Sequence, residues 1–196
     1  MSVPMERQQR MFTYKDYMKW SDEERWELIR GVPYNMTPAP SRKHQEIVGE
    51  LYRVLGNYLE GKSCRAFIAP FDVRLALAEE SDEDVENVIQ PDIVVVCDTT
   101  KLDEKGCKGS PDLVIEVLSP ATAKKDRYEK FRLYEQAKIR EYWIVDPLNR
   151  FVEAYSLEDG KYPLPAAIYE KGDQIKVGVL EDCIIDLNRV FREDSI

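Results

Sequence analysis

The stretch PDLVIEVLSPATAKKD, from Pro111 to Asp126, decides how this chain folds, because it opens with an apolar run typical of the centre of a sheet. The run covers residues 113–118 and lies between two prolines, which predicts a strand buried on both faces. Glu116 interrupts it. An unpaired carboxylate among such neighbours costs roughly several kcal/mol, so Glu116 must be paired, lie at a solvated strand end, or bind a cation.

The residues after this strand predict a crossover unit. A helix is expected within residues 119–140, with Tyr128, Phe131, Tyr134 and Ala137 on one side, and the apolar segment EYWIVDP that follows it reads as the next strand. Strand, helix and strand in this order are typical of two parallel strands joined by a helix. The fold class expected for the chain is therefore α/β or α+β.

The clearest helix in the sequence precedes this unit. The segment SRKHQEIVGELYRVLGNYLEG has Ser41 as its N-cap and Gly61 as its stop signal, and its apolar residues recur at the three-four spacing of a buried stripe. His44 and Glu50 fall outside that stripe. The pattern therefore predicts one long amphipathic helix with both of these side chains away from the core.

Strand and turn signals fill the rest of the chain. The segments CRAFIAPFDVRLAL, residues 64–77, and VIQPDIVVVCD, residues 88–98, each predict one strand, the second of them central in its sheet. Hairpins are expected at Gly31, near the N-terminus, and at Gly160 and Gly172, toward the C-terminus.

Composition narrows the class of protein to a single globular domain spanning residues 1–196. The net charge of -9 argues against a surface that attracts nucleic acid everywhere, although residues 124–140 hold seven basic and three acidic side chains. No apolar run approaches the roughly 18 residues of a membrane span, and the first residues lack the apolar stretch of a secretory signal. A cytoplasmic protein without membrane contact is expected.

The four cysteines, Cys64, Cys97, Cys107 and Cys183, lie far apart in the sequence. They form no CxxC pair, and the single histidine, His44, has no cysteine at zinc-site spacing. The sequence therefore predicts four free thiols, no zinc site and no catalytic cysteine.

Asp92 and Glu116 are the candidates for a metal site. Asp92 immediately precedes the apolar run IVVV, and if that strand lies beside the strand of Glu116, the two carboxylates can converge. Convergent acids repel each other unless a cation lies between them. Oxygen ligands without His or Cys select hard cations, so the pair predicts Mg²⁺ or Mn²⁺. The alternative for Asp92 is a residue that caps a turn at the strand entry.

Phosphodiester hydrolysis at such a site usually also needs a positive side chain. Two residues after Glu116 the sequence has Leu118, so the strand does not supply one. Asp126, Lys130 and Tyr134 follow at successive i, i+4 positions of the next helix, from which Lys130 can reach back toward Glu116. The alternative is a surface lysine in a helical ion pair with Asp126.

Five ordered motifs carry a family resemblance: APSRKHQEIVGEL, APFDVRL, QPDIVVVCD, SPDLVIEVLSPATAKKD and EKFRLYEQAKIREYWIVDP. From about Tyr14 to Val152 the chain resembles the Uma2 family (DUF820) of the PD-(D/E)XK nuclease superfamily. The resemblance implies a restriction-endonuclease-like core, a mixed central sheet flanked by helices, with additional β-hairpins toward both ends. It also implies an active site at the splayed ends of two central strands.

The resemblance implies roles for individual residues. Asp92 in QPD matches the first metal-binding acid of the superfamily, and Glu116 in IEVL matches the second. Glu50 in VGEL matches a position that often supplies a supporting acid. Asp72 in APFDVRL is another motif position, with an open role, and His44 matches the family pattern as a capping or substrate-adjacent residue.

The sequence departs from the superfamily where a lysine is expected, since Leu118 stands two residues after the second acid. In families of this kind the lysine has been thought to migrate to a neighbouring helix. Lys130 is our candidate for that role, Lys124 and Lys125 are weaker ones, and Asp126 is a supporting neighbour. Catalysis therefore depends on a lysine of this helix reaching the metal.

The expected function is an endonuclease that hydrolyses DNA with Mg²⁺ or Mn²⁺, in which Asp92 and Glu116 hold the ion and Lys130 orients the attacking water or stabilises developing charge. A different class of function is a catalytically inactive nuclease-fold module for binding or assembly. A third is a metal-dependent hydrolase of nucleotides or RNA. By analogy with nucleases that cut both strands, a homodimer is expected.

Overall fold

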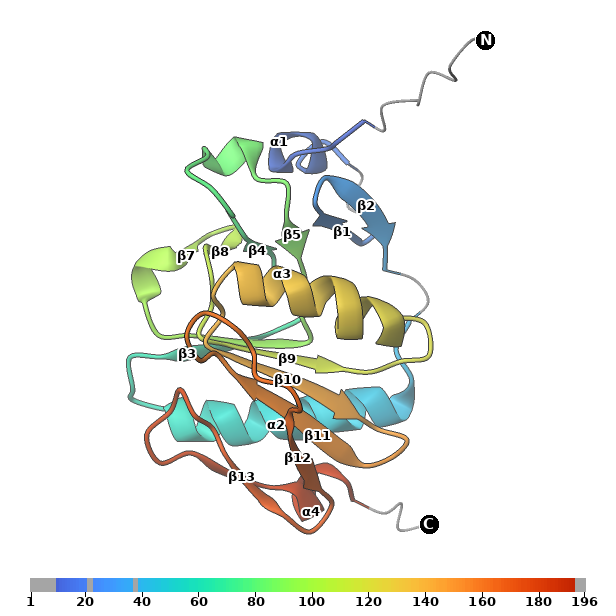
Figure 1. The fold of residues 1–196 in the computed structure, drawn as a ribbon, viewed down its shortest axis with the longest axis vertical. Helices are drawn as coiled ribbons and strands as arrows, with labels where there is room; N and C mark the ends of the chain where they lie inside the picture. The colour runs from blue at the N-terminus through green and yellow to red at the C-terminus, as the bar shows by residue number, and fades with distance from the viewer. Residues whose placement is uncertain (1–9, 21–22, 37–38, 193–196) are drawn as a thin grey trace.

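The computed structural model describes residues 10–20, 23–36 and 39–192, which form two six-stranded sheets and one two-stranded sheet (Figure 1). Sheet A has the strand order β2 (Val32–Asn35), β1 (Trp26–Ile29), β5 (Val88–Ile89), β4 (Val73–Arg74), β8 (Gly106–Lys108), β7 (Leu102–Asp103). Sheet B has the strand order β12 (Ala167–Glu170), β11 (Phe151–Ser156), β10 (Glu141–Asp146), β9 (Leu113–Val117), β6 (Ile93–Val96), β3 (Arg65–Ile68). The two-stranded sheet pairs β13 (Gln174–Lys176) with β14 (Ile184–Asp186).

Helices flank and separate these sheets. The α-helices of the described residues are α1 (Tyr14–Tyr17), α2 (Arg42–Leu59), α3 (Phe131–Gln136) and α4 (Leu187–Val190). A π-helical segment, Lys125–Lys130, leads directly into α3, and short 3₁₀ turns cover 82–84 and 99–101. Figure 1 shows α3 between sheet A and strand β9, with α2 near the opposite side of sheet B.

The predicted crossover unit is confirmed. Strand β9 pairs with β10 in parallel, and α3 lies between them in sequence, whereas β6 pairs with β9 antiparallel. Sheet B is therefore mixed and flanked by helices, as expected. The buried side chains of its two faces belong to two clusters, one shared with α2 and the C-terminal segment, the other with α3 and sheet A.

The long helix also forms as the sequence predicts. The Ser41 hydroxyl oxygen accepts a hydrogen bond from the backbone N–H of His44 at 3.2 Å, which caps α2. The stripe that contains Ile47, Leu51 and Leu55 is buried against sheet B. The expectation for His44 was wrong, because its side chain is buried on the same side of the helix.

Two predicted strands are each divided into two. The segment 64–77 forms β3 in sheet B and β4 in sheet A, and the segment 88–98 forms β5 in sheet A and β6 in sheet B. Pro70 and Pro91 lie at the two divisions, where a residue without an N–H cannot continue a ladder. The chain thus passes between the sheets at both places, and the polar residues Asp72, Gln90 and Asp92 flank these crossings.

The hairpin expectations have mixed outcomes. Arg30 and Gly31, both with positive φ, join β1 to β2 in a two-residue hairpin at the edge of sheet A, and a turn at Gly160 lies between the paired strands β11 and β12. The prediction for Gly172 was wrong: in the described ranges the strands on its two sides do not pair with each other, because β12 pairs with β11 and β13 pairs with β14. The turn at Gly172 instead leads the chain from sheet B into the separate hairpin.

The expectation of four free thiols was wrong. Cys64 and Cys97 form a disulfide with a Cα–Cα distance of 3.8 Å, whereas Cys107 and Cys183 are free and buried. The pairing of Arg65 with Val96 in the β3–β6 ladder places the two cysteines opposite each other just beyond it. This contact depends on strand register, which the 33-residue separation in the sequence hides. Within the described residues, no helix is long and apolar enough to cross a membrane.

Candidate active site

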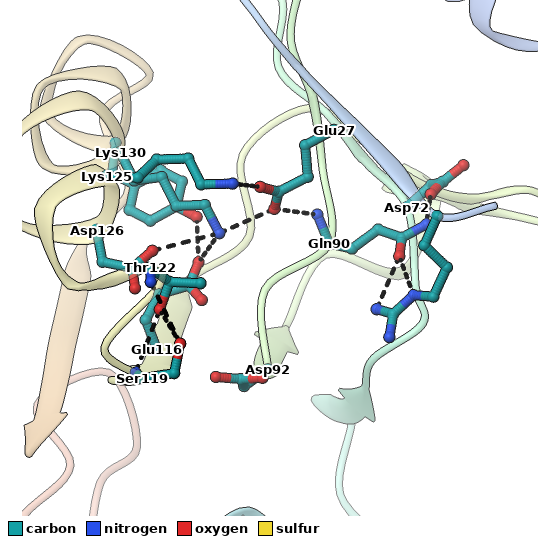
Figure 2. Close-up of polar contacts among 12 residues, drawn as sticks. Glu27, Asp72, Gln90, Asp92, Glu116, Ser119, Thr122, Lys125, Asp126 and Lys130 are labelled. Atoms are coloured by element: carbon teal, nitrogen blue, oxygen red, sulfur yellow. Dashed lines mark hydrogen bonds and ion pairs between the residues drawn. The ribbon is translucent and has the colours of Figure 1, made fainter. Parts of the chain in front are cut away.

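Strand register brings Asp92 and Glu116 together at one end of sheet B. Ile93 pairs with Ile115 in the antiparallel ladder of β6 and β9, so Asp92 and Glu116 follow as the next opposed positions. Opposed residues project from the same face of a sheet. The Asp92 carboxylate also accepts a hydrogen bond from the backbone N–H of Val117 at 2.8 Å, and Figure 2 shows it on the same side as Glu116.

Glu116 is buried, with 4% of its surface exposed. Its Oε1 accepts hydrogen bonds from Lys130 Nζ at 2.8 Å and from the Tyr134 hydroxyl at 2.6 Å. Burial raises the pKa of Glu116 to about 8, although the Lys130 charge lowers it, and the charges of Asp126 and Asp92 raise it further. The carboxylates around Glu116 therefore repel its ionised form, as expected for acids that converge.

The π-helical segment before α3 delivers Lys130 to this carboxylate. A π-helix has i, i+5 hydrogen bonds and a wider turn than an α-helix, so residues four apart lie close to one face. Asp126 and Lys130 both turn toward the sheet and are buried, while Tyr128, which we expected on the apolar side, is 62% exposed. Tyr134 and Ala137 are buried as predicted, so Tyr128 is the exception on the predicted apolar side, and the predicted reach of Lys130 toward the sheet is observed.

Lys130 is a fixed buried cation held by three carboxylates. Its Nζ lies 2.8 Å from Glu116 Oε1, 2.8 Å from Glu27 Oε1 and 3.6 Å from Asp126 Oδ1 (Figure 2). Burial alone would lower the pKa of Lys130, but the charges of Glu116, Glu27 and Asp126 raise it well above its ordinary value. The three surrounding carboxylates therefore favour the charged form of Lys130.

Glu27 is a member of this cluster that the sequence analysis missed. It lies on β1 of sheet A with no exposed surface, and its two oxygens bind two different lysines: Oε1 binds Lys130, and Oε2 binds Lys125 at 2.9 Å. The backbone N–H of Gln90 also donates to Glu27 Oε1 at 3.1 Å. A lone Glu in the apolar strand WELI is the same signal that singled out Glu116, and it could have found this residue.

Asp72 joins the cluster indirectly, through Gln90. The Gln90 side-chain NH₂ donates to Asp72 Oδ1 at 2.8 Å, and Arg25 Nε donates to the Gln90 side-chain oxygen Oε1 at 3.0 Å. The Tyr17 hydroxyl donates to the same Asp72 oxygen at 3.0 Å. Burial raises the pKa of Asp72, and the hydrogen bonds from Gln90 and Tyr17 lower it in part. Asp72 therefore orients Gln90 and makes no direct contact with Glu116 or Lys130 among the described interactions.

His44 contacts Asp92 from the other side of the sheet edge. Its Nε2 lies 3.2 Å from Asp92 Oδ2, and its Nδ1 is buried without a hydrogen-bond partner in the described part of the chain. Burial lowers the pKa of His44, but the hydrogen bond and charge of Asp92 outweigh it and leave the pKa raised. The histidine therefore shares the Asp92 carboxylate with Val117, which binds the same oxygen.

Glu50 is the predicted site residue that the structure does not bring to the cluster. Its carboxylate contacts three arginines, Arg53 on the same helix and Arg189 and Arg192 near the C-terminus. The hydrogen bond from Arg53 lowers the pKa of Glu50, burial opposes this change, and the other arginine charges add to it. The resemblance implies that Glu50 is a supporting acid of the active site. In the structure, Glu50 instead forms ion pairs that link α2 to the C-terminal segment.

The acids of the cluster offer oxygen donors, the type of ligand that hard divalent cations prefer. Four carboxylates, those of Asp92, Glu116, Asp126 and Glu27, face only two lysines, Lys125 and Lys130, beside the Asp92 contact with histidine. Within the described part of the chain, Asp126 Oδ1 is also buried without a hydrogen bond. Among the described residues, no three His, Cys, Asp or Glu side chains stand ready as a metal-binding group. A Mg²⁺ ion commonly takes one or two carboxylates and keeps several waters, so two acids are sufficient.

Comparison with known proteins identifies the family. A model of the Uma2 family, described as "Putative restriction endonuclease", matches residues 14–188. The chain belongs to the Uma2 family. This Uma2 chain is 29% identical over 148 residues to the uncharacterized protein slr1290 of Synechocystis sp., with 74% of each chain covered. It is 27% identical over 151 residues to the uncharacterized protein sll1609 of the same organism, with 74% of this chain and 81% of the other covered.

A solved structure supports the fold of this Uma2 chain. A crystal structure of a "putative nuclease belonging to DUF820" from Anabaena variabilis matches it with a TM-score of 0.72, over 92% of this chain and 97% of that one. The sequence identity is 19%, so the match establishes the fold alone. The mixed α+β architecture expected from the sequence is thereby confirmed.

Proposed function

We propose that this Uma2 protein is an endonuclease that hydrolyses DNA with the help of Mg²⁺ or Mn²⁺. The observation that carries the proposal is the meeting of three predicted residues at one end of sheet B: Asp92 opposes Glu116, and Lys130 lies 2.8 Å from Glu116. Membership in a family described as "Putative restriction endonuclease" supports the same conclusion. The predicted twofold dimer stays a prediction.

In this proposal Asp92 and Glu116 hold the ion, which supplies an activated water and neutralises charge on the phosphoryl oxygens. Lys130 supplies the positive charge that Leu118 cannot, and it stabilises negative charge as it develops on the phosphate. The Tyr134 hydroxyl donates to Glu116 Oε1 and fixes the direction of that carboxylate. The surplus of carboxylates over lysines favours binding of a divalent cation at this point.

Nicking of supercoiled plasmid tests the proposal. We expect the wild-type protein to nick plasmid with Mg²⁺ or Mn²⁺, and we expect Asp92→Asn and Glu116→Gln to lose at least about a hundredfold in rate, because each removes a charged ligand. The matched control is Glu141→Gln, which alters another buried glutamate, on the neighbouring strand β10. Equal nicking by the Asp92, Glu116 and control variants would assign the activity to a contaminant and contradict the proposal.

The second candidate function is a nuclease-fold module that binds or assembles without cleavage. One observation favours it: Glu116 already has a lysine partner, and no three-residue metal group stands ready within the described ranges. Calorimetry separates the two candidates. Binding of Mn²⁺ that is lost in Glu116→Gln supports the enzyme, whereas no divalent binding at millimolar concentration supports the module. The same nicking conditions with an RNA substrate test the third candidate, a hydrolase of RNA.

A further inference from the structure

A separate cavity lies on the opposite face of sheet A from the candidate active site. It has a volume of about 330 Å³ and is lined by Phe12, Trp20, Glu24, Trp26 and Pro33, which we call the aromatic pocket. Trp26 and Glu27 are consecutive residues of strand β1, so their side chains project from opposite faces. Glu27 faces Lys130 in the candidate active site, and Trp26 faces the aromatic pocket.

The rings of the aromatic pocket hold one another in place. Trp20 lies between the other two: its ring centroid is 5.6 Å from that of Phe12 at 74° and 5.7 Å from that of Trp26 at 68°. Such edge-to-face contacts are favourable and restrict ring rotation. All three side chains are only partly buried, so aromatic surface remains accessible. The pocket is therefore lined by ordered aromatic surface before any ligand arrives.

Glu24 adds one polar group with a defined direction. Its Oε2 accepts a hydrogen bond from the Trp26 indole N–H at 3.2 Å, which ties the carboxylate to the pocket wall. Its other oxygen, Oε1, has no hydrogen bond within the described ranges 10–20, 23–36 and 39–192. The aromatic pocket thus combines aromatic surface with a carboxylate oxygen that can accept a hydrogen bond from a ligand.

We infer that the aromatic pocket binds one unstacked base of a single-stranded segment of DNA. A base has a flat π-surface that stacks on aromatic side chains, and the amino groups on its edge can donate to a carboxylate. The volume is at the lower end of the range for small-molecule sites, which suits one base. A phosphate does not suit the pocket, because the Glu24 charge repels it.

This inference rests on the proposed endonuclease function and narrows its substrate. Trp26 and Glu27 project from opposite faces of β1, and β1 lies next to the edge strand β2, so a DNA segment that reaches both sites passes around this edge of sheet A. The pocket then favours DNA with an unpaired or everted nucleotide, since removing a base from an intact duplex costs roughly a few kcal/mol.

Tryptophan fluorescence gives a direct test. Of the three tryptophans in the chain, Trp20 and Trp26 line the pocket, whereas Trp143 is fully buried. A ligand in the pocket therefore changes the emission of Trp20 and Trp26. We expect single-stranded oligonucleotides in EDTA, where no cleavage occurs, to quench this emission, and fully abasic strands of equal length to leave it unchanged. Trp26→Leu should weaken oligonucleotide binding roughly 5- to 150-fold, which corresponds to about 1–3 kcal/mol for one stacked base.

Three controls make the result decisive. Tyr128→Ala removes an exposed ring from the π-helical segment and should leave oligonucleotide affinity unchanged. Glu24→Gln, at an exposed position, preserves the fold and should alter the order of affinities among the four homopolymers, even if Trp26→Leu unfolds. Asp92→Asn should abolish nicking yet retain quenching, because its site lies on the other face of sheet A.

Two outcomes would overturn the inference. Equal binding of abasic and normal strands would show that the bases do not enter the pocket. Quenching by tetramethylammonium but not by oligonucleotides would reassign the pocket to a cation, which aromatic rings and a carboxylate also attract. Failure of the endonuclease proposal is distinguishable from both, because it appears as loss of nicking with base-dependent quenching intact.

Discussion

Two buried glutamates on neighbouring parallel strands, Glu116 on β9 and Glu141 on β10, are held in different ways. Glu141 accepts hydrogen bonds from the Trp143 indole N–H at 2.7 Å and from the backbone N–H of Val179 at 2.9 Å. Glu116 is held instead by a lysine ammonium and a tyrosine hydroxyl. Burial raises the pKa of both carboxyl groups. Burial of an acid therefore does not by itself indicate a catalytic or metal-binding role. The groups that contact the carboxylate distinguish such a role from a structural one.

The groups around Glu116 and Glu141 differ in whether a metal ion could take their place. Two neutral N–H donors, the Trp143 indole and the backbone N–H of Val179, hold the Glu141 carboxylate in one position. Around Glu116, further carboxylates outnumber the lysines, so an additional cation is electrostatically favoured there. We therefore expect changes near Glu116 to affect both stability and metal binding, and changes at Glu141 to affect stability alone.

Lys130→Met should have the largest effect on stability. It leaves Glu116, Glu27 and Asp126 buried without their shared cation, and breaking a buried ion pair from one side costs about 3–5 kcal/mol. Urea unfolding measures the loss. Mn²⁺ should stabilise this variant more than the wild type, because the ion replaces the missing positive charge and binds only the folded state.

Arg127→Met is the matched control for this prediction. Arg127 lies on the same π-helical segment and pairs with Glu153, but its side chain is 31% exposed, so its removal should cost about 1 kcal/mol or less. Equal stabilisation by Mn²⁺ of the wild type and the Lys130 variant would contradict the idea that the ion and the lysine compensate the same carboxylates.

Glu27→Gln should have the next largest effect. The substitution keeps the size of the side chain but removes the charge that holds Lys125 and Lys130 from sheet A, for which we expect about 2–3 kcal/mol in urea unfolding. It should also weaken Mn²⁺ binding in calorimetry, since one of four carboxylates is lost. Unchanged affinity for Mn²⁺ would limit Glu27 to a structural role between the sheets.

The sequence alone predicted the part of this cluster that lies on sheet B and the π-helical segment. Glu116 is conspicuous within its apolar run, and the spacing of Asp126 and Lys130 places both on one helical face, so local patterns predicted the residues that meet on sheet B. Glu27 escaped because its contact crosses between two sheets, and no local spacing encodes the distance from β1 to the π-helical segment. Glu50 was carried over by resemblance, and its arginine partners near residues 189–192 could not be read locally.

The difference between local patterns and contacts between distant segments also explains the other features that the sequence analysis missed. Pro70 and Pro91 were visible in the sequence, but the decision to pass from one sheet to the other at each of them depends on how the two sheets pack. The disulfide of Cys64 and Cys97 follows from the register of β3 and β6, which is a property of the assembled sheet. Element type was therefore predictable, whereas the passage of the chain between the sheets and the disulfide partner were not.

Glu141→Gln tests the structural half of the comparison. Both oxygens of Glu141 accept hydrogen bonds, and a glutamine can satisfy only one of these positions because its amide nitrogen is a donor. An unsatisfied buried donor costs about 1–3 kcal/mol, so we expect a loss at the lower end of this range in urea unfolding. Plasmid nicking and Mn²⁺ affinity should match the wild type, and a loss of either would remove the distinction between the two glutamates.

The smallest expected effect is a pH dependence of the difference in unfolding free energy between the wild type and Glu141→Gln. In the unfolded chain Glu141 ionises at its ordinary pKa of 4.5, and burial raises the pKa in the folded protein. Between these two values the folded state binds more protons than the unfolded state, so the free energy of unfolding falls as pH rises through the window. Glu141→Gln lacks this titration. The stability advantage of the wild type over the variant should therefore be largest near pH 4 and shrink toward neutral pH. A constant difference across that range would mean that the hydrogen bonds to Glu141 fully offset the cost of burying its charge.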